Sequence, residues 1–163
     1  MKKILIVGLG NILLQDEGVG IHVIEKLRKE TDISPEVELI EGETRGLALL
    51  PLLTKGTFII FVDAMEFEGV SGKIKVLRGN EIISANSKPI SVHEVGLGDI
   101  ISLITLTEGI EPPKIVLVGV KPVNLGTGLQ LSPEVERSIP EIIQIIKQEV
   151  KRFKEELMVE NPV

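Results

Sequence analysis

Residues 3–20, KILIVGLGNILLQDEGVG, set the expected architecture of this chain. After its first residue, the segment Lys3–Gly8 is a run of Ile, Leu and Val, which is typical of a parallel strand buried on both faces. A glycine-rich loop follows, and the segment from about Asp16 to Glu30 has the apolar spacing of a helix. A buried strand, a glycine loop and a helix together indicate the first half of a βαβ unit.

The rest of the chain repeats this alternation. Short apolar runs predict four further strands, at Val37–Ile40, Thr57–Asp63, Ile74–Val76 and Lys114–Gly119. Helical spacing predicts helices at Thr44–Leu53, from near His93 to Thr107, and from Ser132-Pro133 onward, with a polar loop from about Gly79 to Pro89. Because Pro140 falls inside the last helix and Ser138–Glu141 matches a capping box, we expect that helix to kink or restart there.

These elements predict one α/β domain over residues 1–163. The expected fold is a three-layer α/β/α sandwich around a largely parallel five-stranded sheet with one antiparallel edge strand. Lysines alternate with Ile74 and Val76, which favours an edge position, because charged side chains on an edge strand discourage pairing with other chains.

Composition excludes several classes of function. The chain has no Cys, so it has no disulfide, no thiolate metal site and no cysteine nucleophile, and any metal ligands must be His, Asp or Glu. It has four Phe, no Trp and no Tyr, and its 18 basic and 24 acidic residues give a net charge of −6. Few stacking platforms and a negative charge argue against nucleic-acid binding.

No targeting or membrane segment is expected. The apolar run Ile4–Val7 is shorter than the roughly 7–15 residues of a signal-peptide core. No stretch reaches the roughly 18–20 continuous apolar residues of a membrane span. We therefore expect a soluble, cytoplasmic protein that does not bind membranes and acts as a monomer.

Three side chains with metal-binding chemistry are expected at one edge of the sheet. In open α/β sheets, sites form outside the carboxyl ends of the strands, where the strand order reverses. Asp63 ends an apolar strand, Glu17 follows the first glycine loop, and His93 opens a helix that can reach the same edge. Two carboxylates and one imidazole form an N/O donor set suited to a divalent transition metal, with positions left open for a substrate.

Structural interpretations compete at these positions. Asp16 is a favoured N-cap residue, and Glu17 in a first helical turn suits the helix dipole. A lone histidine at a helix start, such as His93, is more often structural than a ligand. The spacing alone leaves the metal site and the structural interpretation open.

A nucleotide site is not expected. The pair Gly8 and Gly10 resembles the start of a dinucleotide fingerprint, but Leu13 occupies the position of the third glycine. Phosphates favour a positive helix N-terminus, whereas Asp16 and Glu17 make this one negative. The chain also lacks a Walker A sequence and a nucleophile elbow.

The motifs taken together resemble those of the [NiFe]-hydrogenase maturation endopeptidases. They follow one another in the same order from about residue 2 to about residue 150: Gly8–Gly20 (GLGNILLQDEGVG), Asp63-Ala64, Lys88–Asp99 (KPISVHEVGLGD), Leu117–Pro122 and Leu131–Pro133. The resemblance implies a hydrolase of the aspartic type that cuts one peptide bond. It would remove a C-terminal extension from the hydrogenase large-subunit precursor after nickel has been inserted.

The resemblance also implies roles for single residues. Glu17, Asp63 and His93 match the nickel-contacting residues, with the nickel supplied by the precursor and no nucleotide cofactor. Asp16 is the candidate base for activating water, although the metal could instead only position the substrate.

Candidate substrate-binding residues are Asn11, Gly42 and Thr44. The segment Gly42-Glu43-Thr44 departs from the Gly-Gly-Thr of many relatives, which puts the fine substrate specificity in question. An alternative is a nickel-delivery module that uses the same three ligands without cutting anything.

Overall fold

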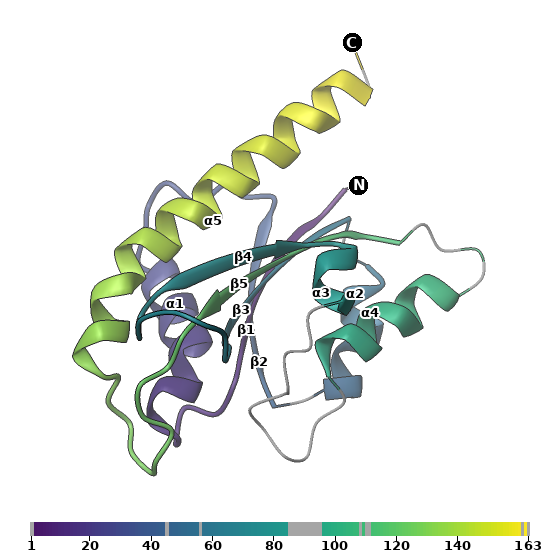
Figure 1. Cartoon of the computed structure of the whole chain (residues 1–163). Coiled ribbons are helices and arrows are strands. Elements are labelled where there is room, and N and C mark those ends of the chain that lie inside the picture. Colours follow the sequence, from purple (N-terminus) through teal and green to yellow (C-terminus); the bar gives the residue numbers. More distant parts are fainter. Residues whose placement is uncertain are drawn as a thin grey trace.

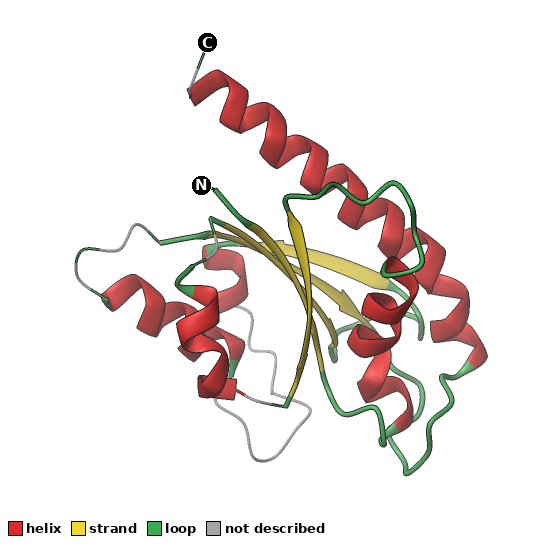
Figure 2. Ribbon diagram, turned by 180° about the vertical axis from the view of Figure 1, so that it is seen from behind, coloured by secondary structure: helices red, strands yellow, loops and turns green. Residues whose placement is uncertain are grey.

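A five-stranded sheet lies between two groups of helices (Figures 1 and 2). The computed structural model describes residues 2–44, 46–55, 57–84, 96–107, 109, 112–160 and 162, without the side chain of Leu52. The strands are β1 (Ile4–Leu9), β2 (Val37–Glu43), β3 (Phe58–Ala64), β4 (Ile74–Arg78) and β5 (Lys114–Val120). The helices are α1 (Val19–Leu27), α2 (Leu50–Leu53), α3 (Asn80–Ser84), α4 (Leu97–Leu106) and α5 (Pro133–Glu160), with 3-10 turns η1 (Gln15–Gly18) and η2 (Gly46–Leu49).

The strand order is β2-β1-β3-β5-β4. The first four strands of this order run parallel, and β4 pairs antiparallel with β5 at one edge. From β1 the chain moves outward to β2 and then returns to the other side of β1 to form β3. The strand order therefore reverses between β1 and β3. The expected fold, including the antiparallel edge strand, is confirmed.

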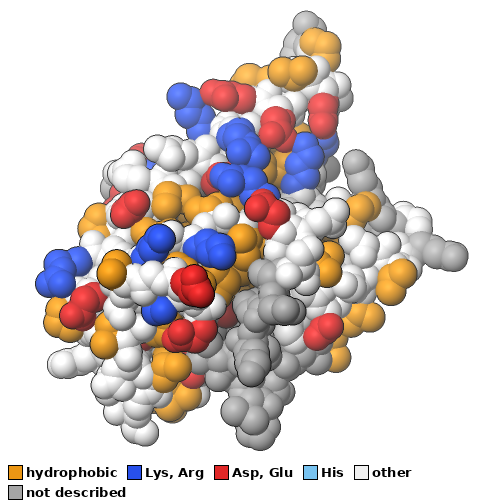
Figure 3. Space-filling view, in the orientation of Figure 1, with side chains coloured by type: hydrophobic (Ala, Val, Ile, Leu, Met, Phe, Trp, Pro, Cys, Tyr) orange, Lys and Arg blue, Asp and Glu red, His pale blue; other side chains and the backbone are white. Residues whose placement is uncertain are grey.

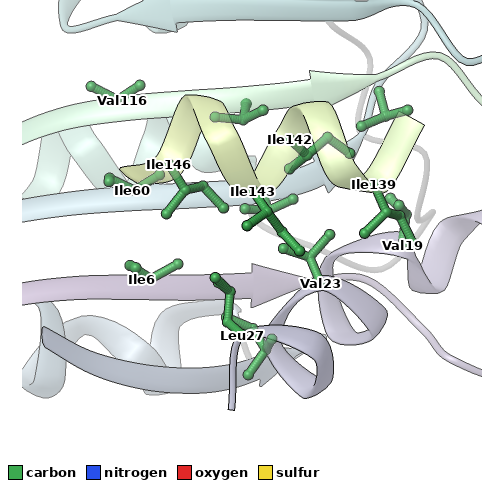
Figure 4. Packing of buried hydrophobic residues seen from close by; sticks show 14 of the residues in the cluster. Ile6, Val19, Val23, Leu27, Ile60, Val116, Ile139, Ile142, Ile143 and Ile146 are labelled. Atoms are coloured by element: carbon green, nitrogen blue, oxygen red, sulfur yellow. The ribbon is translucent and has the colours of Figure 1, made fainter. Parts of the chain in front are cut away.

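Each face of the sheet has its own apolar core. Ile4 and Ile6 of β1 face the layer of α1 and α5, whereas Leu5 and Val7 face the layer of η2, α2, α3 and α4. Figure 4 shows the first core, where Ile142 and other α5 residues pack over the strands. Because both faces are covered, β1 is apolar at every inner position. Fully burying one such side chain contributes about 1.5–3 kcal/mol.

The helix expected from about Asp16 begins later than the sequence predicts. Residues Gln15–Gly18 form a 3-10 turn, and α1 starts at Val19. The expected N-cap is absent, because the Asp16 carboxylate binds a distant loop instead of the first turn of α1.

Two other expected segments also differ from the structure. The helix expected at Thr44–Leu53 is reduced to a 3-10 turn and the single turn of α2. The described part of the loop expected from Gly79 contains the short helix α3.

The helix α5 continues through Pro140, so the expected restart there is wrong. Pro140 is exposed, so water can bind the Glu136 carbonyl that loses its helical partner. Ile139 and Ile142, on either side of the proline, are fully buried and hold both halves against the sheet. Ser138 is not a cap: its hydroxyl donates to the Val135 carbonyl at 2.6 Å inside the helix.

Within the described residues, none of the helices has both the length and the apolarity needed to cross a bilayer.

Candidate functional site

The expected site lies where β1 and β3 end, an edge that we call the switch-point edge (Figure 1). Gly10 stands at its centre with φ +106°, and its N–H donates to the Glu43 carbonyl at 2.9 Å. A Cβ atom on Gly10 would lie 1.8 Å from the backbone oxygen of Glu17 and 3.4 Å from Oδ1 of Asp63. Glycine is thus required here for space as well as for φ, with the Glu17 main chain and the Asp63 carboxylate close to it.

The surroundings of the two acidic residues differ. Glu17 lies in η1 and is only 4% exposed. Asp63 is partly exposed near the end of β3, and its Oδ1 accepts a hydrogen bond from the Ala64 N–H at 2.8 Å. His93 lies outside the described residues. Within those residues no three His, Cys, Asp or Glu side chains form a group that could hold a metal ion. The structure therefore places the backbone of Glu17 and the carboxylate of Asp63 next to Gly10, and the metal-binding set of Glu17, Asp63 and His93 stays a prediction.

Asp16 is fully buried and saturated with hydrogen-bond donors. Its Oδ2 accepts from the N–H groups of Val123 and Asn124, both at 2.9 Å, and from the Ser132 hydroxyl at 2.8 Å. Its Oδ1 accepts from the Ser132 N–H at 2.7 Å. Burial by itself raises the pKa of Asp16, but the hydrogen bonds from Asn124, Ser132 and Val123 together outweigh burial and lower it. The carboxylate therefore stays ionised well into the acid range.

These contacts favour a structural role for Asp16. A general base needs a lone pair that can reach water and a pKa near the working pH. The Asp16 carboxylate has four donors, no exposure and a lowered pKa. It ties η1, which contains Glu17, to the loop that follows β5.

The three candidate substrate-binding residues have different surroundings. Asn11 is partly buried, and its side-chain oxygen accepts from the Leu13 N–H at 2.9 Å, so it shapes its own loop as an Asx turn. Gly42 is buried, and a Cβ there would lie 2.8 Å from a methyl group of Val7. Thr44 is exposed. Of these three, Thr44 has the side chain that is most open to a ligand.

The sequence interpretation gave residues 123–130 of the loop after β5 no role at this edge. Val123, Asn124 and Ser132 bind the Asp16 carboxylate. Ser132 belongs to the motif Leu131–Pro133, whereas Val123 and Asn124 lie outside the motifs. The composition of this loop does set it apart from the rest of the sequence: the twelve residues 122–133 contain no Asp, Glu, Lys or Arg in a chain that is 26% charged.

A doubly wound α/β domain with acidic residues at its switch point belongs to the class of proteins that bind their ligands outside the carboxyl ends of the strands. A family model described as hydrogenase maturation protease matches residues 21–149, and the chain belongs to this family. The hydrogenase 2 maturation protease of Escherichia coli (strain K12) is 35% identical over 146 residues, 88% of each chain.

Solved structures agree with this assignment. The hydrogenase maturating endopeptidase HybD from E. coli has a TM-score of 0.84 and 32% identity, covering 92% of this chain and 93% of that one. A hydrogenase 2 maturation peptidase from Thaumarchaeota archaeon SCGC_AB-539-E09 has a TM-score of 0.69 and 28% identity, covering 91% and 98%. The protein is thus a peptidase, and the expected class of hydrogenase maturation endopeptidase is confirmed.

Proposed function

We propose that the protein removes the C-terminal extension of a [NiFe]-hydrogenase large-subunit precursor after nickel has been inserted. In this proposal the nickel reaches the site as part of the substrate, and Glu17, Asp63 and His93 complete its coordination. The large subunit can then close around its finished centre.

The position of Glu17 and Asp63 beside Gly10, with the Glu17 main chain and the Asp63 carboxylate next to it, supports this proposal most directly. Both acidic residues lie at the switch point of the sheet, where α/β proteins bind their ligands. Oxygen ligands from carboxylates and a nitrogen from an imidazole leave coordination positions for the substrate's own ligands.

The donor set also favours metal that arrives with the substrate. The chain has no Cys, and thiolates bind nickel more tightly than carboxylates do. A precursor that holds nickel on thiolates keeps the ion, and this protein recognises it second. Nickel thereby serves as the signal that the precursor is ready to be cut.

The decisive experiment compares nickel-loaded and nickel-free precursor, each incubated with chelator-treated enzyme and no added metal. We expect mass spectrometry to show a shortened chain only for the nickel-loaded precursor. Equal cleavage of both precursors would show that metal recognition does not control the cut. A nickel-delivery module would leave the precursor length unchanged.

Single substitutions test the residues. Glu17→Gln, Asp63→Asn and His93→Ala are each expected to abolish cleavage, because each removes the charge of a carboxylate ligand or the imidazole nitrogen. Glu66→Gln is the matched control: Glu66 follows Asp63 by three positions, its side chain is 58% exposed, and its contact is an ion pair of 3.9 Å with Lys121. Thermal melts check that each variant folds, and cleavage by all three site variants would refute the assignment.

A further inference from the structure

Two loops beside the switch-point edge form one surface. We call residues 11–15 and 122–131 the paired loops. The Gly128 N–H donates to the Leu13 carbonyl at 2.8 Å, and the Gln15 N–H donates to the Gly128 carbonyl at 2.9 Å. Together these bonds form a parallel bridge between Leu14 and Gly128. The loops after β1 and β5 therefore run side by side at the lower end of the molecule (Figure 1).

Several further contacts fix the shape of the paired loops. The Asp16 N–H donates to the Asn124 carbonyl at 3.1 Å, and the Gln15 side chain donates to the Thr127 carbonyl at 3.3 Å. Gln15 has φ +49°, a conformation that a residue with a side chain keeps only when its surroundings hold it there. The surface is thus preorganised, which lowers the entropic cost of binding a partner.

The paired loops present large apolar side chains to solvent. Leu13 is 58% exposed, Val123 is 50% exposed and Leu129 is 61% exposed. Figure 3 shows hydrophobic side chains among uncharged ones at this lower end of the molecule.

The same loops carry no charge. Residues 8–15 and 122–133 contain no Asp, Glu, Lys or Arg in a chain that is 26% charged. Depletion of charged residues around exposed apolar side chains is characteristic of the core of a protein interface.

We propose that the paired loops are the docking surface for the precursor, and that they bind an uncharged, apolar stretch of it beside the peptide bond that is cut. This inference rests on the proposed function. The surface adjoins the site, because Gln15 and Glu17 both belong to η1 and the Asp16 N–H between them donates to the Asn124 carbonyl of the second loop.

The absence of charge distinguishes this partner from others. Membrane-surface binding uses Lys and Arg around apolar side chains, and the paired loops have neither. Apolar docking also predicts that kcat/KM for the precursor changes little between low and high salt, since few charge pairs form across the contact.

The test replaces Leu13 and Leu129 singly by Glu. Both side chains are more than half exposed, so the melting temperature should not change. With nickel-loaded precursor we expect kcat/KM to fall about tenfold or more, through KM and with kcat retained, because a charge is placed against an apolar partner. Leu129→Gln, which adds no charge, should give a smaller loss.

Met158→Glu is the matched control. Met158 is 74% exposed and lies near the end of α5, about 38 Å along the helix axis from its start at the switch-point edge. We expect this variant to cut with unchanged kcat/KM.

The outcomes separate the docking surface from the function itself. If the unaltered protein does not shorten any nickel-loaded precursor, the proposed function fails. If it does, and both Glu variants retain its KM, the docking surface is wrong while the function stands. The docking surface is also wrong if light scattering shows a dimer that Leu129→Glu dissociates, or if phosphatidylcholine vesicles bind the unaltered protein but not that variant.

Discussion

Replacing Asp16 by Asn should destabilise the protein strongly although only one atom changes. If the amide oxygen takes the place of Oδ2, the amide nitrogen faces the Ser132 N–H, which now lies 2.7 Å from Oδ1. One buried donor then loses its acceptor, at a cost of about 1–3 kcal/mol. The three bonds to Oδ2 lose their charge assistance, which roughly halves the strength of each. We expect a total loss of about 3–5 kcal/mol of unfolding free energy.

The effect of this substitution should depend on pH. The folded state lowers the pKa of Asp16, while the unfolded chain keeps the ordinary value of about 3.9. The stabilisation by the carboxylate is therefore complete above that value and is lost as the pH falls through the folded-state pKa. Since Asn does not titrate, the difference between the two proteins should stay constant near neutral pH and shrink below about pH 4.

Urea denaturation with a chelator present measures this difference at neutral and at acid pH. A loss of this size should also lower the melting temperature by about 10 °C. Asp32→Asn is the matched control: the Asp32 side chain is 63% exposed and pairs with Lys147 at 3.0 Å, so this substitution should lower the unfolding free energy far less than Asp16→Asn does. If Asp16→Asn costs less than about 1 kcal/mol at neutral pH and nevertheless abolishes cleavage, the structural role is refuted and the general-base interpretation gains.

Three further predictions concern other parts of the fold. Gly20→Ala should lower the unfolding free energy by about 3 kcal/mol or more in chemical denaturation, because the new Cβ would lie 2.3 Å from a backbone oxygen. Gly98→Ala is the control: its Cβ would meet nothing nearer than 3.7 Å, so this substitution should be neutral or stabilise by up to about 1 kcal/mol. Glu43 has φ +49°, a left-handed conformation that glycine adopts freely and a β-branched residue resists. Glu43→Gly should therefore change the unfolding free energy by less than about 1 kcal/mol, whereas Glu43→Val should lower it more. Equal effects of the two substitutions would show that the backbone at this position is not strained. Arg78→Met should cost about 1–3 kcal/mol, because the buried Glu149 carboxylate would keep only the longer contact with Arg152, at 3.9 Å. Adding Glu149→Met should restore most of that loss, and no recovery would show that the pair is not the cause.

Local patterns were enough to predict the layers of this protein. The apolar segments Lys3–Gly8 and Thr57–Asp63 became central strands, because a strand covered on both faces must be apolar at every inner position. The same patterns placed Asp63 at the tip of its strand and Glu17 beyond the first loop, and both lie at the switch-point edge. Local rules failed at Pro140, where contacts of α5 with the sheet outweigh the break that a proline favours.

The role of each residue at the switch-point edge depends on contacts between segments far apart in the chain. Asp16 matched an N-cap in sequence, but Ser132, 116 positions later, binds its carboxylate. The Leu13 carbonyl likewise accepts a hydrogen bond from the distant Gly128 N–H, and the Leu13 side chain is exposed to solvent. Such contacts exist because β1, β3 and β5 end at one edge, so that the loops after β1 and β5 meet there. The periodicity or spacing of residues within one segment cannot predict the contact between these two loops, because the contact forms only when the strands have paired.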